Sequence, residues 1–282
     1  SDFENIRIKK NFSIIGIHDH SYLIGSENME QMERNGQSSV RQRLWRIRAK
    51  HVILATGAIE RPLVFAGNDI PGVMLCSAAL EFYKLYGVSP GDRVVVLTNN
   101  DSAYSSVIEL FNAGISVPLV IDVREKSDGN LPLKAKKLGI RVEFSKAISK
   151  VIGKKKVKAV ELCSVVGEGA VLETIICDSV LMSGGWTSTL NLWSHCGGKI
   201  KWDSKLNTLV PDESFPSINE FGRSFITVLG SADGKFWPSD LFANIEKKLN
   251  ILYSELNLKK TKITRFDINK NTNGETSSIF CV

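Results

Sequence analysis

The segment from Gly91 to Glu125 most strongly constrains the fold of this chain. It begins with an apolar run, GDRVVVLTNN, continues with an amphipathic stretch, DSAYSSVIELFNAG, and closes with a second apolar run, ISVPLVIDVRE. Continuous apolar runs of this length are typical of strands buried on both faces, and the stretch between them has the period of a helix. A strand, a helix and a parallel strand within about 35 residues form a βαβ unit whose helix packs back over the sheet. The sequence therefore predicts an α/β domain with a parallel sheet.

The chain after this unit continues the same domain. Residues 131–148 have the pattern of a further helix and strand, and KVKAVELCSV and GAVLETIICDSVLMSGG alternate like an antiparallel meander. The meander leads to one more buried strand, at 177–183. The βαβ unit and the elements up to the end of the meander predict an inserted domain of about a hundred residues, and the strand at 177–183 is expected to return to the surrounding domain.

The segments on both sides of the insertion are predicted to form another domain. Residues 5–16 and 44–55 are typical of strands, with a polar hairpin or loop at 25–41 between them. Near the end, FITVLGSADG predicts a buried strand, and PSDLFANIEKKLNILYSEL predicts a helix with Pro and Asp in its first turn. We therefore expect a first domain in two parts, 1–73 and 177–258, an inserted second domain, 74–176, and a tail or linker, 259–282.

Composition excludes several classes of protein. The 282 residues are 43% hydrophobic and 23% charged, with no apolar run of the roughly 18 residues that a membrane span needs, and SDFENIRIKK lacks the apolar core of a signal peptide. We expect a soluble, cytoplasmic protein. The net charge of +6 comes from scattered clusters that predict solvated faces rather than a nucleic-acid groove. The five cysteines form no CxxC pair, which argues against a disulfide scaffold, a structural metal and a dithiol reductase.

The segment ILATGAIERPLVFAGNDIPGVML, at 53–75, contains the sharpest local motif. A strand that ends in Ala55-Thr56-Gly57 places small side chains at the carboxyl edge of a sheet, where a dinucleotide can lie against the backbone. An ordinary strand-ending turn would have the same three residues. Thr56 and Gly57 are candidate cofactor-binding residues.

The turn after the first strand of the βαβ unit departs from the glycine-rich phosphate-binding pattern. It contains Asn99, Asn100 and Asp101 where GxGxxG is usual, and Asp101 places a negative charge where a phosphate would bind. We expect the second nucleotide site to be empty. Asp122 at the end of the next strand could bind a ribose hydroxyl or pair with Arg124, and Asn99, Asn100 and Asp122 are kept as candidates for that site.

The turn GSADG, at 230–234, is a third candidate element. Its Asp lies three residues after Gly230, which puts direct contact between that carboxylate and a ligand in doubt. Backbone groups near Ala232 and the start of the following helix are better candidates. The predicted cofactor-binding residues here are Gly230, Ser231, Ala232, Trp237 and Ser239, and Trp237 could equally be a core-packing aromatic.

Two histidine motifs could indicate a metal site or a nucleophile pair. His18 and His20 share one face of a strand, but no third metal ligand is identifiable, so a surface turn is favoured. His195 is adjacent to Cys196, yet sequence neighbours rarely form a nucleophile pair. Trp186 and Trp193 are interpreted as packing residues. No catalytic residue and no metal site is predicted.

The motifs ATGAIERPLVFAGNDIPGVML, TNNDSAY and SGGWTSTLNLWSHCGGKIKWD together resemble the α subunit of heterotetrameric sarcosine oxidase. The α subunits of opine dehydrogenases and dye-linked proline dehydrogenases are similar. The resemblance spans residues 5 to 245 and implies a two-dinucleotide-binding-domain flavoprotein fold of the glutathione-reductase type. The opening GxGxxG unit of that fold and the folate-binding domain of the family are not found in this sequence, so we expect a segment of a longer protein with an incomplete first domain.

The resemblance also implies cofactors and partners. The α subunit holds a non-covalent, structural NAD, which Ile14 and the residues at 56–57 and 230–239 would line. FAD and FMN are held mainly with the β subunit, and γ and δ subunits complete the complex. The intact enzyme would oxidise sarcosine to glycine, forming hydrogen peroxide and, on tetrahydrofolate, 5,10-methylenetetrahydrofolate.

Three alternatives remain open. The chain could be part of the α subunit of a related opine or proline dehydrogenase. The chain could be a noncatalytic scaffold that binds a nucleotide such as ATP and assembles other subunits. It could also be a self-sufficient NAD(P)H reductase, which the absence of GxGxxG and CxxC disfavours.

Overall fold

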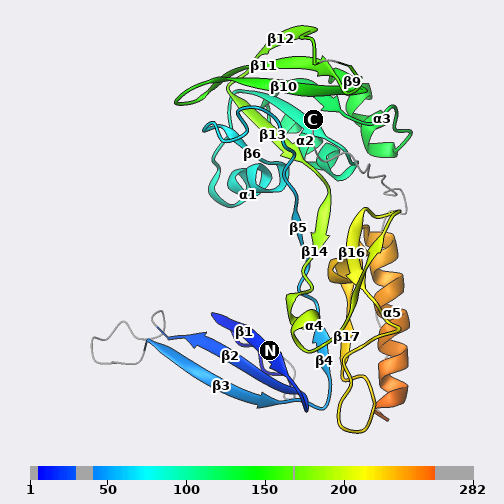
Figure 1. Cartoon of the computed structure of the whole chain (residues 1–282). Coiled ribbons are helices and arrows are strands. Elements are labelled where there is room, and N and C mark those ends of the chain that lie inside the picture. Colours follow the sequence, from blue (N-terminus) through cyan, green and yellow to red (C-terminus); the bar gives the residue numbers. More distant parts are fainter. Residues whose placement is uncertain (1–5, 30–40, 168, 258–282) are drawn as a thin grey trace.

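The computed structural model describes residues 6–29, 41–167 and 169–257, which form two lobes joined by paired strands (Figure 1). The first lobe contains a five-stranded parallel sheet. Its strands, in spatial order, are β6 (Val73–Leu75), β13 (Ser179–Ser183), β7 (Arg93–Thr98), β8 (Ser116–Asp122) and β9 (Val142–Phe144). Helices α1 (Cys76–Tyr86), α2 (Ser102–Asn112) and α3 (Asn130–Lys137) belong to this lobe. The predicted βαβ unit is β7-α2-β8.

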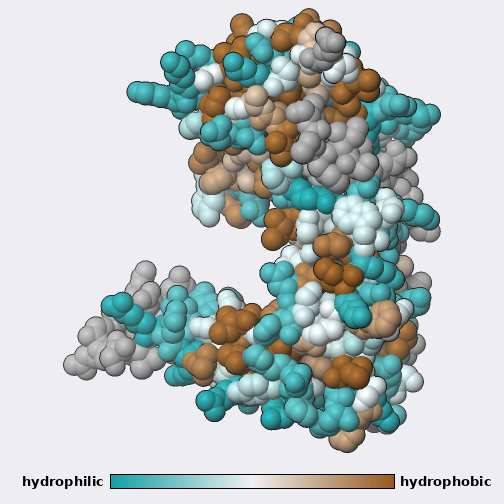
Figure 2. Space-filling model, viewed as in Figure 1, coloured by the Kyte–Doolittle hydropathy of each residue, from teal (hydrophilic) through white to brown (hydrophobic). Residues whose placement is uncertain are grey.

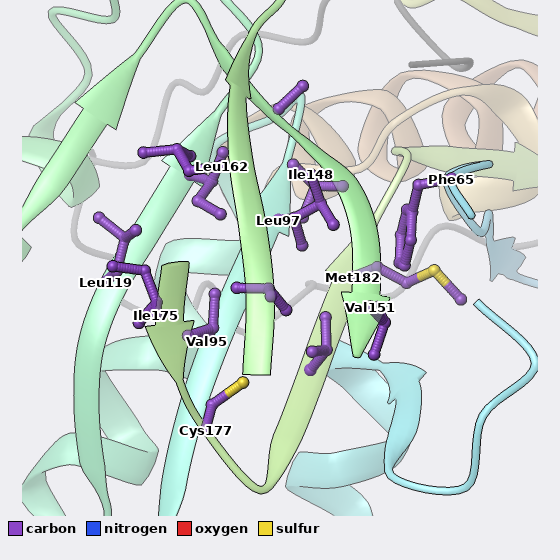
Figure 3. Close-up of a cluster of buried hydrophobic side chains, with 14 of the residues drawn as sticks. Phe65, Val95, Leu97, Leu119, Ile148, Val151, Leu162, Ile175, Cys177 and Met182 are labelled. Carbon is purple, nitrogen blue, oxygen red and sulfur yellow. The ribbon is translucent and has the colours of Figure 1, made fainter. Parts of the chain in front are cut away.

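The central strands are apolar along their whole length because both faces of the sheet are covered. Val95 and Leu97 pack against the antiparallel sheet of β10 (Lys146–Gly153), β11 (Val157–Ser164) and β12 (Glu173–Ile176). Figure 3 shows this cluster, with side chains of the two sheets pointing toward one another. Val94 and Val96, with the opposite orientation, pack against α1 and α2 in a second cluster. The alternation of side chains along β7 thus fills two cores at once.

Strand β13 corrects one expected boundary. A boundary between residues 176 and 177 assigned this strand to the first domain, but β13 pairs in parallel with both β6 and β7. The reason is local: only Cys177 and Asp178 separate β12 from β13, and Val180 and Leu181 are completely buried in the two cores of the parallel sheet. The strand is therefore a central member of the inserted domain's sheet.

In the described residues, the second lobe contains short sheets, two α-helices and one 3-10 helix. An antiparallel sheet contains β1 (Phe12–His18), β2 (Tyr22–Asn28) and β3 (Gln42–Arg48). β4 (Val52–Leu54) and β17 (Ile226–Val228) pair in parallel, and β15 (Ile200–Asp203) pairs with β16 (Thr208–Pro211). The helices are α4 (Asn191–His195), the short 3-10 helix η1 (Gly230–Asp233) and α5 (Pro238–Glu255). Their common core contains Ile17, Leu54, Trp193 and Phe225.

The expected amino-terminal strands are shifted. The first begins at Phe12 rather than at residue 5, and residues 25–28, expected in a loop, belong to β2. The second expected strand, 44–55, is divided into β3 and β4 because the chain leaves the antiparallel sheet and joins β17. Residues 30–40 of the expected loop and the tail at 259–282 lie outside the described residues.

The lobes are connected by β5 (Ala58–Glu60) and β14 (Trp186–Ser188), which pair antiparallel. Figure 1 shows this strand pair as the bridge between the lobes, and Figure 2 shows the molecule hollowed on one side of it. Within the described ranges, no helix is long and apolar enough to cross a membrane.

Candidate functional site

A cavity of about 230 Å³ lies where the two lobes meet the connecting strands. We call it the interlobe cavity. It receives residues from the turn before α2, from β5 and β14, from the β15–β16 turn and from the segment before α5. Its lining residues are Ala58, Asn100, Ser102, Trp186, Lys205, Leu206, Ser231, Phe236 and Trp237. Three of the residues predicted from the sequence, Asn100, Ser231 and Trp237, are thus brought together.

Residues Ala55, Thr56 and Gly57, which we call the ATG turn, lie next to this cavity, since the following residue, Ala58, is one of its lining residues. The hydroxyl of Thr56 donates to the carbonyl of Thr189 at 2.7 Å, and the Thr189 amide donates to the carbonyl of Gly57 at 3.0 Å. Gly57 has φ +74°, and no atom lies within 4 Å of the place where a Cβ would stand. The carboxyl end of β4 is therefore an open backbone surface at which a ligand can approach.

The GSADG turn lies beside the same strand end. The Leu229 amide donates to the carbonyl of Leu54 at 2.8 Å, and the hydroxyl of Ser188 donates to the carbonyl of Ser231 at 2.9 Å. Gly230 adopts φ +71°, which favours glycine. Ala232 is completely buried in the second-lobe core rather than presented to the cavity. The turn therefore offers Ser231, and not Ala232, as a lining side chain.

The carboxylate of Asp233 is held by α5. The ammonium of Lys248 lies 2.7 Å from this carboxylate and also donates to the carbonyl of Val228 at 3.0 Å. Burial raises the pKa of Asp233, and Lys248 opposes that rise. Trp237 is the N-cap residue of α5, whose first turn carries the positive end of the helix dipole. The side chain of Ser239 lies outside the described residues.

The turn that replaces GxGxxG forms a network of side chains. Asn100 is 1% exposed, and its amide donates to the carbonyl and hydroxyl of Ser183 at 3.1 and 3.0 Å. The hydroxyl of Ser102 donates to the side-chain oxygen of Asn100, and the indole N–H of Trp186 donates to that hydroxyl at 2.9 Å. The Asn99 side-chain oxygen accepts from the Asn100 amide at 3.1 Å. Asn99 itself is completely buried and does not line the cavity.

Asp122 is fully engaged by protein groups. Its carboxylate accepts from the Arg124 guanidinium at 2.7 Å and from the Tyr104 hydroxyl at 2.8 Å, and Asp122 is completely buried. Burial and the neighbouring carboxylate of Asp122 raise the pKa of Tyr104. Of the two readings left open for Asp122, the geometry favours the pair with Arg124.

The remaining candidates lie elsewhere. Ile14 packs against the second-lobe core and is not among the residues that line the interlobe cavity. The rings of His18 and His195 lie 5.0 Å apart, and His20 pairs with Glu220. Across the described part of the chain, no three His, Cys, Asp or Glu residues form a group that could hold a metal ion. Burial raises the pKa of the Cys196 thiol, which disfavours a nucleophilic thiolate.

A second cavity, of about 200 Å³, lies between α5 and β17. His51 lines it and shares a hydrogen bond of 2.8 Å with the Thr227 hydroxyl. Burial lowers the pKa of His51. None of the predicted nucleotide-binding residues lines this cavity, so the interlobe cavity is the candidate functional site.

Comparison with known proteins finds similarity to subunits of two oxidases, sarcosine oxidase and opine oxidase. The chain is 32% identical over 224 residues to the alpha subunit of the sarcosine oxidase of Rhizobium meliloti (strain 1021), a match that covers 79% of this chain and 22% of the relative. It is 35% identical over 210 residues to the alpha subunit of the sarcosine oxidase of Corynebacterium sp. (strain P-1), covering 71% of this chain and 21% of the relative. The chain is thus similar to one segment of these sarcosine oxidase alpha subunits. An opine oxidase subunit of Agrobacterium tumefaciens (strain Ach5) is 25% identical over 57% of this chain and 35% of the relative. No family model matches the chain.

Solved structures place the segment among flavoprotein-like folds. The thioredoxin reductase of T. acidophilum has a TM-score of 0.61 at 18% identity, covering 87% of this chain and 74% of that chain. The L-proline dehydrogenase of P. horikoshii has a TM-score of 0.53 at 22% identity, covering 94% of this chain and 48% of that chain. The predicted α/β fold of the dinucleotide-binding flavoprotein kind is confirmed. This chain spans about a fifth of the length of the sarcosine oxidase subunits that it matches.

Sequence reasoning missed part of the site. Trp186 was interpreted as a packing residue, and Ser102, Lys205 and Phe236 were not singled out. The SGGW motif, at 183–186, could have identified Trp186 as a candidate site residue. An aromatic residue directly after a buried strand that ends in glycine lies at the carboxyl edge of the sheet, where α/β folds bind ligands.

Proposed function

We propose that this chain is the nucleotide-binding segment of a sarcosine-oxidase-type α subunit, and that its interlobe cavity and ATG turn hold a non-covalent NAD without redox use. The supporting observation is that Ser231 and Trp237, the N-cap residue of α5, line the cavity, and that Gly57 directly precedes the lining residue Ala58. A backbone without Cβ groups and a helix N-terminus are the features that dinucleotide-binding folds use for a pyrophosphate. The alpha subunits named above support the assignment.

The residues present fit one side of such a cradle. Among the described residues β4 pairs with β17 alone, so its second edge can accept a further strand. We propose that a strand, a glycine-rich turn and a helix, from chain outside these 282 residues or from another chain, complete the cradle there.

The cavity favours binding over reaction. Among the residues that the structure describes, its lining includes no carboxylate, histidine or cysteine, and the Ser102 hydroxyl is already bonded to Asn100 and Trp186. We therefore propose that this segment contributes no acid, base or nucleophile. The reaction would take place on FAD and FMN held mainly with a β subunit, in a cytoplasmic complex with γ and δ subunits. It would convert sarcosine to glycine with hydrogen peroxide and, through a folate-binding domain, 5,10-methylenetetrahydrofolate.

Two alternatives keep support. An opine or proline dehydrogenase α subunit would share the same fold, in line with the opine oxidase relative. A noncatalytic scaffold that binds another nucleotide would use the same cavity. A self-sufficient reductase is disfavoured because Asp101 and Arg124 fill the second nucleotide turn.

A nucleotide screen tests the proposal. Thermal shifts with NAD, ATP, FMN and FAD are measured on the chain alone and on the chain extended by a strand, glycine-rich turn and helix, with absorbance recorded for bound flavin. We expect NAD to stabilise the extended chain and no flavin to bind either form. A flavin that binds the chain alone would overturn the proposal, and stabilisation by ATP but not NAD would favour the scaffold.

A further inference from the structure

We infer that the interlobe cavity binds a planar heteroaromatic ring that carries an anionic group, and that Ser102 and Asn100 position Trp186 as the wall for this ring. The inference deepens the proposed function and rests on it, since it concerns the same cavity. It assigns a ligand-facing role to Trp186 and a positioning role to the turn that has lost its glycines.

The lining of the cavity is suited to a ring. Trp186, Phe236 and Trp237 are three of its nine lining residues, and they come from two separate segments of the chain. Aromatic side chains bind planar ligands through stacking and edge-to-face contacts. A cavity of about 230 Å³ accommodates one ring system rather than a whole dinucleotide. The ring end of a nucleotide would therefore lie here.

Trp186 is held in a fixed orientation. Its indole N–H donates to the Ser102 hydroxyl at 2.9 Å, and that hydroxyl donates to the side chain of Asn100. Asn100 is anchored by two hydrogen bonds to Ser183, at the end of β13. The backbone of Trp186 is paired with Glu60 in the β5–β14 ladder. Because the N–H edge of the indole is already bonded, a ligand meets the ring through its faces or carbon edge.

The charges at the cavity favour an anion. Among the described residues that line the cavity, Lys205 is the one charged residue. The Asp203 carboxylate accepts from the backbone amides of Lys205 and Leu206, at 2.9 and 3.0 Å. The acidic residues of the two flanking turns, Asp101 and Asp233, bind Arg124 and Lys248 and are not lining residues. The charged side chain that the described lining offers to a ligand is therefore a cation.

Tryptophan fluorescence on the full 282-residue chain tests the inference. AMP, nicotinamide mononucleotide and FMN are titrated as ring-bearing anions, adenosine as a ring without charge, and ribose 5-phosphate as an anion without a ring. We expect saturable quenching by at least one ring-bearing anion, and an affinity about tenfold lower for its uncharged or ringless counterpart.

Four variants identify the residues. Trp186→Phe should lower the affinity about tenfold and remove part of the quenching, since Trp237 also lines the cavity, whereas Trp193→Phe, in the second-lobe core, should leave both unchanged. Ser102→Ala should shift the Trp186 emission and weaken binding several-fold, as expected when an orienting hydrogen bond is lost. Ser102→Thr, which keeps the hydroxyl, should restore both. Thermal melts show whether each variant is folded.

The outcomes separate the inference from the proposed function. Equal binding by the Trp186→Phe and Trp193→Phe variants, or equal binding of AMP and ribose 5-phosphate, overturns the inference even if NAD stabilises the extended chain. Binding of AMP or FMN that Trp186→Phe weakens about tenfold, without any effect of NAD, supports the inference and overturns the NAD assignment. Absence of quenching by every ring-bearing anion overturns the inference.

Discussion

The guanidinium of Arg124 lies 2.7 Å from the carboxylate of Asp101, the residue that precedes the first turn of α2. Both side chains are less than 10% exposed, and the same guanidinium also pairs with Asp122 at 2.7 Å. In a Rossmann unit the N-terminus of this helix binds the pyrophosphate of a dinucleotide. Here an internal carboxylate with its own cation occupies that place, so we expect the second unit not to bind a pyrophosphate there.

Loss of Arg124 should destabilise the first lobe strongly. Burial lowers the pKa of Arg124, but the hydrogen bonds and charges of Asp122 and Asp101 outweigh that effect and raise the pKa, so the residue stays charged. Arg124→Met would leave two buried carboxylates without their cation, at a cost of about 3–5 kcal/mol. The measurement is the free energy of unfolding in urea.

Arg141→Gln is the matched control for this prediction. Arg141 also pairs with two carboxylates, those of Glu143 and Glu173, but its side chain is 45% exposed. Water screens such pairs, so this variant should lose much less stability than Arg124→Met. Equal losses in the two variants would contradict the view that burial makes the Asp101–Arg124–Asp122 network costly to break.

The fold could be predicted from the sequence in the segments where the spacing of apolar residues matches the burial of the side chains in the structure. The apolar runs of β7 and β8 and the amphipathic α2 predicted a βαβ unit, because a parallel sheet covered on both faces requires that pattern. Helix α1 was not predicted, since its exposed Phe82, Leu85 and Tyr86 blur the polar face that defines an amphipathic helix. The partner of β13 depended on contacts with segments more than 80 residues away, which local patterns do not contain.

The candidate site was predicted only in part for a similar reason. Thr56, Gly57 and Ser231 carry backbone motifs that can be read locally. The position of Trp186 at the cavity depends on its hydrogen bond to Ser102, which lies 84 positions earlier in the chain, and local sequence patterns do not contain such a contact. Asp233 was already in doubt as a ligand contact from its spacing, and its pair with Lys248 on α5 supplies the physical reason.

Glu60 should make stability fall as the pH rises. It is 5% exposed, and burial raises the pKa of its carboxyl above the ordinary 4.5, although hydrogen bonds from Ser183 and Ser77 oppose the rise. Since the folded chain then holds a proton that the unfolded chain has released, the stability contributed below pH 4.5 is lost as the pH passes through the raised pKa. Glu60→Gln should remove this loss, because the amide oxygen still accepts from the amide of Ser77, 2.8 Å away.

The test compares urea unfolding of the parent and Glu60→Gln chains from about pH 4 to about pH 8, the range in which a raised carboxyl pKa would titrate. Glu109→Gln, which removes an exposed carboxylate paired with Lys84, is the control and should leave the slope of stability against pH nearly unchanged. Parallel pH profiles for the parent and Glu60→Gln chains would show that Glu60 does not carry the pH dependence.

Asp233 should be a structural residue rather than a ligand contact. Asp233→Asn and Lys248→Met break the same ion pair from opposite sides and should each cost about 1–3 kcal/mol of stability. The double variant should cost less than the sum of the single losses, because each single variant includes the loss of the Asp233–Lys248 pair, although Lys248→Met also removes the contacts of Lys248 with Glu213 and Val228. Nucleotide affinity, measured by fluorescence, should change less than about twofold in Asp233→Asn, well under the tenfold that corresponds to about 1.4 kcal/mol. A tenfold loss of affinity at unchanged stability would instead make Asp233 a ligand contact.

Gly57 and Gly87 form a matched pair for testing backbone approach at the ATG turn. They have φ values of +74° and +66°, and at neither position would a Cβ meet an atom within 4 Å. Alanine at either position should therefore cost a similar stability of about 1–2 kcal/mol from left-handed strain alone. Gly87 follows α1 and lies outside the interlobe cavity, so Gly87→Ala should leave nucleotide affinity unchanged.

Gly57→Ala would place a methyl group where the pyrophosphate of NAD is proposed to lie. The affinity of the extended chain for NAD should therefore fall at least tenfold, the equivalent of about 1.4 kcal/mol. Equal NAD affinities in the two variants would mean that the ligand does not contact this turn and would move the proposed cradle away from the end of β4.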